Sequence, residues 1–321
     1  MNKDINYARR NKSHSLDTLE VTSDSFNSKN HETLYRSTLQ KHSTINSLLK
    51  LIDVSDEVSK KQYWKTYHCR NVLLQDGNKL VGSLCRKRWC QTCNRIRTAE
   101  LVKAYHKPLQ ELQSENGLYL VTLTAPTVKA RNLSSEIDKR YKAFTRAKDN
   151  LRKNYGIKLV GGRKLEVEYN KETDKYHPHF HLIQQGKHEA QMLQKLWLDQ
   201  FPKASIKAQD ITIVDAKNPE NLLEVFKYAT KGTTKDETDA KANHIIYTAL
   251  KGRRIFQTYG KLSKVKEPIE AREENSVVDF IPPKREIYVY EHHLKDYTNA
   301  NFETLIGTKQ IERNLIKHKE I

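Results

Sequence analysis

The chain has 321 residues, which is enough for one large domain or two small ones. Only 37% of the residues are hydrophobic and 30% are charged, and 57 Lys and Arg against 39 Asp and Glu give a net charge of +18. Such an excess of positive charge favours a polyanionic partner, with nucleic acid as the first candidate. No apolar run approaches the ~18 residues that a membrane-spanning helix needs, so we do not expect an integral membrane protein.

The cysteines and the first residues indicate the compartment. Four Cys in a chain of this length are too few for a disulfide scaffold. The opening residues MNKDINYARRNKS contain no apolar segment of the kind that a secretory signal carries. We therefore expect a protein of the reducing cytoplasm.

Changes in composition divide the chain into four predicted parts. Residues 1–60 are rich in Ser, Asn, Lys and His and are predicted as a flexible polar arm, apart from a short helix near residues 48–52. Residues 61–115 contain all four Cys, followed by a helix that ends near Pro108. Residues 116–264 carry most of the regular apolar patterns. Residues 265–321 form a charged extension, with a candidate strand over 287–290 and a helix in the last twenty residues.

Strand and helix patterns alternate in the third part. Strands are indicated by short apolar runs or strict alternation, and helices by apolar side chains at steps of three and four. In chain order we predict a strand, an amphipathic helix, two strands of a hairpin, a helix, a strand and a helix, over residues 118–124, 133–154, 158–170, 177–184, 188–201, 206–215 and 218–230. The first six elements match a split βαβ, ferredoxin-like pattern. We therefore predict the α+β class with a mostly antiparallel sheet.

Three histidines lie close together on the second strand of the predicted hairpin. Because alternate side chains of a strand share one face, His179 and His181 point the same way, and two neutral imidazoles on a rigid strand suit a divalent metal. Folding the hairpin places Glu166 opposite His179, and Glu168 nearer His177. We favour Glu166 as the third ligand, with Glu168 as the alternative because a slip of one residue changes the pairing. A polar sheet face without a metal is the competing interpretation.

The predicted helix over 218–230 carries a candidate nucleophile. Glu224 and Tyr228 lie four residues apart and share one helix face, and Lys231 lies one turn further along it. A Tyr hydroxyl has a pKa near 10, so it is a poor nucleophile unless its deprotonation is assisted. In the functional interpretation Tyr228 attacks a phosphate and stores the cleaved bond as a phosphotyrosine ester. Glu224 then acts as a base or activates a water, and Lys231 holds phosphate or phenolate charge. A packing Tyr beside a surface ion pair is the alternative.

The four cysteines form a cluster in the sequence. Cys85, Cys90 and Cys93 have the spacing C-x4-C-x2-C, and Cys69 precedes them. Four thiols are what a closed tetrahedral zinc site requires, so we predict structural Zn²⁺ here. His68 is an alternative ligand, and ordinary buried thiols are the alternative to a metal site.

Basic side chains are interleaved with these cysteines, and Trp89 lies among them. Basic side chains beside an aromatic suit phosphate contact and base stacking, and a zinc site would rigidify that surface. The predicted DNA-binding residues are Arg86, Lys87, Arg88, Arg95 and Arg97.

Four blocks, at residues 85–94, 165–170, 176–183 and 224–231, occur together in this order. Jointly they resemble the plasmid rolling-circle replication initiators, a branch of the HUH endonucleases. HUH denotes His, a hydrophobic residue and His, here His179, Phe180 and His181. The resemblance covers roughly residues 61–264. Gln91 stands where a Pro is often seen, and Glu168 where Thr is more usual.

The resemblance implies an HUH endonuclease domain over 116–264 and an enzyme that nicks one DNA strand at a plasmid origin. Tyr228 would be the nucleophile and stay linked to the 5′ phosphate until the strand is rejoined. Mg²⁺ or Mn²⁺ would be held by His179, His181 and Glu166, and Glu224 would aid the terminating cleavage. The implied partners are origin DNA, single-stranded or hairpin, and a host helicase and polymerase.

Two other functions fit parts of the pattern. A zinc-containing DNA-binding regulator without catalysis would share the charge and the cysteines. A transposase or mobilisation relaxase would share the HUH chemistry. Only the histidine strand together with the tyrosine helix separates the enzymes from the regulator.

Overall fold

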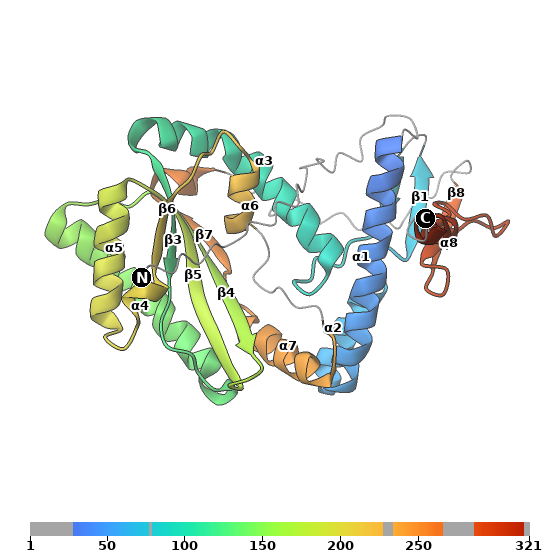
Figure 1. Cartoon of the computed structure of the whole chain (residues 1–321), viewed down its shortest axis with the longest axis horizontal. Helices are drawn as coiled ribbons and strands as arrows, with labels where there is room; N and C mark the ends of the chain where they lie inside the picture. The colour runs from blue at the N-terminus through green and yellow to red at the C-terminus, as the bar shows by residue number, and fades with distance from the viewer. Residues whose placement is uncertain (1–27, 77–78, 227–233, 266–285, 318–321) are drawn as a thin grey trace, which may run out of the picture.

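The protein belongs to the α+β class, as predicted, with two antiparallel sheets flanked by helices (Figure 1). The structure is a computed structural model that describes residues 28–76, 79–226, 234–265 and 286–317. The two sheets lie at opposite ends of the molecule, and helix α3 (Gln91–Asn116) runs between them. No helix among the described residues is long and apolar enough to cross a membrane.

The larger sheet has five strands in the order β6-β3-β5-β4-β7. Its strands are β3 (Leu118–Leu123), β4 (Gly161–Asn170), β5 (Lys175–Gln185), β6 (Asp210–Ile213) and β7 (Phe256–Tyr259). Strand β5 lies between β3 and β4 and is antiparallel to both, while α4 (Leu133–Tyr155) connects β3 to β4. This is the connectivity that a split βαβ unit requires, whereas the finer ferredoxin-like assignment stays a prediction.

One face of this sheet packs against α4 and α5 (Lys187–Gln200). Phe180 and Leu182 of β5 point to this side, and the ring of Phe180 lies 5.7 Å from that of Trp197. Helix α4 contributes Ile137 and Phe144, which recur on one helix side because its apolar residues are spaced by three and four. The expected amphipathic helix is therefore confirmed.

The other face packs against α3 and α6 (Glu220–Phe226). Ile183 of β5 is buried there with Leu109 of α3 and Leu222 of α6. Because side chains alternate along a strand, His179 and His181 lie on this same face. Helix α3 continues past Pro108, where we predicted its end, since Leu109 and Leu112 beyond the proline are buried.

The amino-terminal region differs from the prediction. The described part of residues 1–60 forms α1 (Ser28–Asp53) and the start of α2 (Glu57–Tyr67), so a flexible arm is wrong for most of residues 28–60. Ile45, Leu48 and Leu51 recur at steps of three and are buried, which gives α1 a packing face despite its polar composition. Residues 1–27 lie outside the described part of the chain.

The smaller sheet combines segments from both ends of the chain. Its order is β2-β1-β8-β9, with β1 (Val72–Asp76), β2 (Lys79–Gly82), β8 (Glu286–Glu291) and β9 (Asp296–Thr298). Tyr288 and Tyr290 of β8 pack with Leu73 of β1 and Ile45 of α1. The candidate strand of the extension is thus confirmed as β8. The remaining helices are α7 (Glu237–Leu250) and α8 (Thr308–Lys317), with short 3-10 turns at Ala130–Asn132, Ile206–Ala208 and Gly260–Lys264.

Candidate active site and cysteine cluster

Glu166, His179 and His181 converge on the sheet face that α3 and α6 cover. In the β4–β5 register Glu166 lies opposite His179, as the hairpin prediction expected. The Nε2 atoms of the two histidines are 3.1 Å apart, and Oε2 of Glu166 is 3.4 Å from Nε2 of His181. One ligand atom from each of the three residues lies within 4.8 Å of the others. Glu166 and His179 are buried, whereas His181 is half-buried with 18% of its side chain exposed.

Hydrogen bonds at the other ring nitrogens orient the two imidazoles. Nδ1 of His179 lies 3.0 Å from the carbonyl oxygen of His177, which can only accept, so this Nδ1 carries the proton. Nδ1 of His181 lies 3.3 Å from Oγ1 of Thr122. When His181 also donates from Nδ1, both Nε2 atoms present lone pairs to each other, which is unfavourable unless a proton or a cation lies between them.

The donor set therefore fits a divalent cation. Two ligand atoms bound at about 2.1 Å with a right angle between them are about 3 Å apart, close to the observed spacing of the two Nε2 atoms. Two imidazoles and a carboxylate are ligands that first-row divalent metals accept.

Glu168, the alternative third ligand, faces a different residue. It lies opposite His177 in the register, and the group of converging ligand atoms contains Glu166 but not Glu168. The ring of His177 stacks on that of His179 with centroids 4.8 Å apart. Burial, and then the neighbouring His179, lower the pKa of His177 to about 4, so this ring is neutral near pH 7.

Lys164 is a site residue that the sequence interpretation missed. It shares the β4 face with Glu166, lies opposite His181 in the register, and places Nζ 3.2 Å from Oε2 of Glu166. The side chains of Lys164 and Glu166 are only 4% and 5% exposed. The available signal was the alternation itself, because the residue two before Glu166 on a strand must share its face.

Helix α6 brings the chain towards this cluster. Asn218 caps its amino end, since Oδ1 of Asn218 accepts a hydrogen bond from the Glu220 amide. At its other end Phe226 packs against Phe256 of β7, with ring centroids 5.2 Å apart, and Phe256 pairs with Lys164 in the β4–β7 register. The predicted nucleophile Tyr228 and the cation Lys231 lie outside the described residues, as does the side chain of Glu224.

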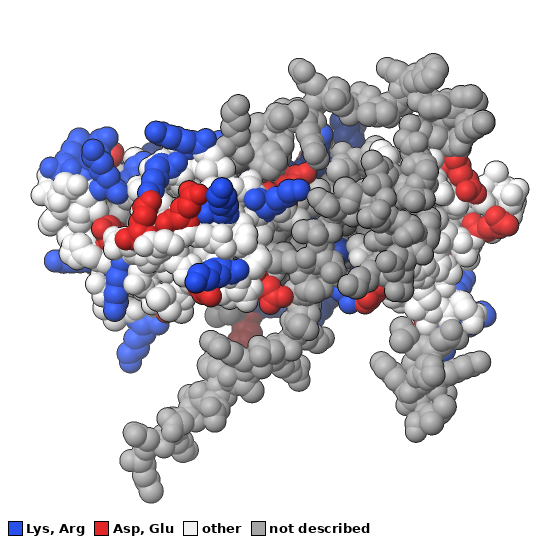
Figure 2. Space-filling model, turned by 90° about the horizontal axis from the view of Figure 1, so that it is seen from above, with Lys and Arg blue, Asp and Glu red and all other residues white. Residues whose placement is uncertain are grey.

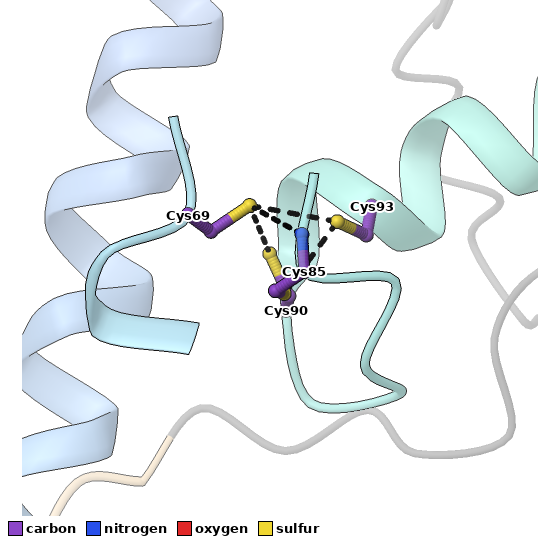
Figure 3. Close-up of side chains that lie close together, drawn as sticks. All are labelled: Cys69, Cys85, Cys90 and Cys93. Atoms are coloured by element: carbon purple, nitrogen blue, oxygen red, sulfur yellow. Dashed lines mark hydrogen bonds between the residues drawn. The ribbon is translucent and has the colours of Figure 1, made fainter. Parts of the chain in front are cut away.

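The four cysteines form a second cluster (Figure 3). Cys69 follows α2, Cys85 follows β2, Cys90 directly precedes α3 and Cys93 lies in the first turn of α3. The sulfur of Cys69 is 3.6 Å from that of Cys93 and 3.8 Å from that of Cys90, and Cys85 and Cys93 are 3.7 Å apart. Four sulfurs bound to one zinc at about 2.3 Å lie about 3.8 Å apart. The donor set thus fits zinc, and all four thiols are free.

Contacts within the cluster shift the pKa values of its thiols in opposite directions, because hydrogen bonds with Cys69 and then Cys85 raise the pKa of Cys90 and of Cys93. The backbone amides of Cys85 and Arg86 donate to the sulfurs of Cys69 and Cys93, each at 3.3 Å. Hydrogen bonds with Cys69, then with Cys90 and Cys93, lower the pKa of the Cys85 thiol. His68, the alternative ligand, is exposed and contacts Asn71 instead of joining the cluster.

The predicted DNA-binding residues fall into two groups. Arg88 donates to the carbonyl oxygens of Leu250 and Arg253, at 2.6 and 2.5 Å, and so holds the carboxyl end of α7. Trp89 packs between α2 and α7. Its ring centroid lies 5.0 Å from that of Tyr63 and 5.4 Å from that of Tyr247. The other predicted residues, Arg86, Lys87, Arg95 and Arg97, are exposed or half-buried.

Basic side chains are also abundant away from the cysteines. Figure 2 shows many Lys and Arg side chains at the end of the molecule that holds the five-stranded sheet, with several acidic side chains among them. The charged surface is therefore wider than the segment that the sequence interpretation singled out.

The fold and the two clusters define a basic α+β protein with two groups of side chains suited to metal ions. A family model described as "Replication protein" matches residues 79–303, and the chain belongs to this family. The family resemblance drawn from the sequence blocks is thereby confirmed.

Curated relatives carry the name "Protein rep". The Staphylococcus aureus protein is 32% identical over 160 residues, which cover 46% of this chain and 69% of the relative. A Bacillus sp protein is 26% identical over 216 residues, covering 56% of this chain and 69% of the relative. The Bacillus amyloliquefaciens protein is 27% identical over 216 residues, which cover 56% of this chain and 63% of the relative. No solved structure gives a significant match to the chain.

Proposed function

We propose that this chain initiates rolling-circle replication of a plasmid by nicking one strand at the origin. Tyr228 attacks the scissile phosphate, the strand stays attached as a 5′-phosphotyrosine ester, and transesterification later rejoins it. The observation that carries the proposal is the convergence of Glu166, His179 and His181 on the sheet face that α6 covers. The family match favours replication over transposition or mobilisation, which use the same chemistry.

Glu166, His179 and His181 are the residues that would hold the catalytic cation. A bound Mg²⁺ or Mn²⁺ supplies charge neutralisation at the phosphate oxygens and orients the scissile bond. The protein keeps Nε2 of His179 free to bind because its Nδ1 proton is committed to the carbonyl of His177. Thr122 of β3 contacts Nδ1 of His181 and so positions that ring, with Nε2 on the side of Glu166.

The position of Phe226 supports Tyr228 as the nucleophile. Phe226 packs on Phe256, which pairs with Lys164 on the strand that carries Glu166. The described part of α6 ends at Phe226, and the proposal assigns the attacking hydroxyl to Tyr228, two residues further along the chain. In this proposal Glu224 acts as a base or activates a water for the terminating cleavage, and Lys231 stabilises negative charge.

The cysteine cluster would hold a structural Zn²⁺ through Cys69, Cys85, Cys90 and Cys93. It joins the ends of α2 and β2 to the start of α3, and α3 packs on the sheet face of the candidate active site. Exposed basic residues next to it, with Arg86 as the most accessible, would contact DNA phosphates.

The proposed partner is origin DNA in single-stranded or hairpin form, with a host helicase and polymerase acting downstream. A cluster of reduced thiols suits action in the cytoplasm.

The experiment is a covalent-adduct assay with origin-region single-stranded DNA and Mn²⁺, resolved on a denaturing gel. The wild-type protein should form a protein–DNA band that EDTA abolishes. Tyr228→Phe should abolish the band, while Tyr155→Phe, at an exposed tyrosine at the end of α4, should retain it. A band that persists in Tyr228→Phe would show that another residue is the nucleophile.

A further inference from the structure

A buried ammonium group stands directly beside the proposed third metal ligand. Lys164 and Glu166 lie on one face of β4, and Nζ of Lys164 is 3.2 Å from Oε2 of Glu166. The same Oε2 is 3.4 Å from Nε2 of His181, the cross-strand neighbour of Lys164. One carboxylate oxygen thus serves both the lysine and the ligand cluster.

In this arrangement the ammonium of Lys164 would repel a cation bound by Glu166. A divalent cation held by Glu166 would be a positive charge close to a second positive charge in a poorly solvated place, since both side chains are at most 5% exposed. Like charges in such a place repel strongly, because little water screens them. A cation therefore binds here most favourably when an anion is present to balance the lysine.

The ligand set leaves a positive excess that a phosphate can balance. Glu166 supplies one negative charge and the imidazoles of His179 and His181 supply none, so a divalent cation together with Lys164 gives the centre a net charge of about +2. A phosphodiester carries a single negative charge at each linkage, and an ammonium is a compact donor for phosphate oxygens.

We propose that Lys164 is a phosphate-binding residue of this site, paired with Glu166 in the cation-free protein and moving to an oxygen of the scissile phosphodiester when a cation takes Glu166. The lysine then makes cation binding and DNA binding mutually dependent, because each relieves the charge that opposes the other. This inference rests on the proposed function for the identity of its anion, a DNA phosphate.

The first test uses Mn²⁺ alone, without DNA, so that it does not depend on nicking. Free Mn²⁺ is followed by its electron paramagnetic resonance signal during titration of the full chain. Lys164→Met removes the ammonium but keeps an unbranched side chain, and should tighten Mn²⁺ binding about tenfold. Lys164→Arg keeps the charge and should stay near wild type. Lys171→Met removes an exposed lysine of the same hairpin and should change nothing.

The second test measures single-stranded DNA affinity by fluorescence anisotropy in a Tyr228→Phe background, which prevents cleavage. Adding Lys164→Met should weaken binding about tenfold in Mn²⁺ and much less in EDTA. Lys164→Gln serves as a second variant, and circular dichroism checks that each variant is folded.

The outcomes separate the two claims. Two results would overturn the inference and make Lys164 a structural partner of Glu166. One is weaker or unchanged Mn²⁺ binding in both Lys164→Met and Lys164→Gln. The other is an equal loss of DNA affinity with and without Mn²⁺. Absence of a covalent adduct in the wild-type protein would instead contradict the proposed function, while tighter Mn²⁺ binding in Lys164→Met would still stand.

Discussion

Thr122 and His181 are cross-strand neighbours on β3 and β5, and their side chains meet at 3.3 Å between Oγ1 and Nδ1. This contact positions the His181 ring in the candidate metal site, although Thr122 is not itself a proposed metal ligand. A threonine on an adjacent strand thus controls which nitrogen of His181 faces Glu166.

Thr122→Val keeps the shape of the side chain and removes the hydroxyl. The ring of His181 then loses its orienting partner, so Mn²⁺ affinity should fall about tenfold, as expected when a supporting hydrogen bond to a metal ligand is lost. Calorimetric titration with Mn²⁺ measures the effect. Thr212→Val, at an exposed position of β6, is the matched control and should bind Mn²⁺ normally. Unchanged affinity in Thr122→Val would mean that the contact does not orient the ligand.

The depressed pKa of His177 predicts a loss of stability at acidic pH. Its pKa is about 4 in the folded protein and near 6.5 in the unfolded chain, so the unfolded chain binds more protons between these values. The contribution of His177 to the free energy of unfolding is present above about pH 6.5 and is lost as pH falls towards 4. Urea denaturation between pH 7 and 4.5, in EDTA, should show a smaller decrease for His177→Gln than for wild type.

His293→Gln is the control for the pH series, because His293 is exposed and its loss should leave the wild-type pH dependence intact. If His177→Gln and the wild-type protein lose stability in parallel, the half-buried ring of His177 is not the source of the acid sensitivity.

Removal of one cysteine should release the structural zinc. Cys93→Ser leaves three thiols, and we expect less than one zinc per chain by atomic absorption and a lowered melting temperature, because metal binding contributes directly to folding at such sites. His68→Ala should retain zinc, since His68 lies outside the sulfur cluster. Zinc retained in Cys93→Ser but lost in His68→Ala would reverse the assignment.

Replacement of Arg88 by alanine should lower folding stability, whereas replacement of Arg86 should weaken DNA binding. Arg88→Ala removes both hydrogen bonds to the end of α7, and should lower the free energy of unfolding by about 1–3 kcal/mol in urea denaturation. Arg86→Ala should leave stability unchanged but weaken DNA binding, with the slope of log affinity against log salt reduced by about 1. Equal stability of the two variants, or equal DNA affinity, would contradict this division of roles.

Local patterns predicted that Glu166, His179 and His181 lie together on one sheet face. The alternation of Glu166 and Glu168 on one strand and of His179 and His181 on the next fixed which side chains share a face, and the turn between them set the register. These inferences need only neighbouring residues, which explains their agreement with the structure.

Contacts between distant segments could not be predicted from one sequence. The pairing of β1 with β8 joins residues more than two hundred positions apart, and the hydrogen bonds of Arg88 reach carbonyls of α7. The periodicity of α1 is obscured because Lys41 and Thr44 are buried on its packing side, where Lys41 donates to the carbonyl of Cys69. Helix α7 carried a local signal that the sequence analysis missed. Asp236 caps its amino end, and Oδ1 of Asp236 accepts a hydrogen bond from the Asp239 amide.

The most direct test of the central claim is identification of the residue that carries the DNA. The wild-type protein is incubated with origin-region single-stranded DNA and Mn²⁺, digested with nuclease and protease, and examined by mass spectrometry. The account predicts a nucleotide phosphate on the peptide that contains Tyr228, and no adduct when Glu166, His179 or His181 is replaced by alanine. A nucleotide on any other peptide, or an adduct that survives loss of those three side chains, would contradict it.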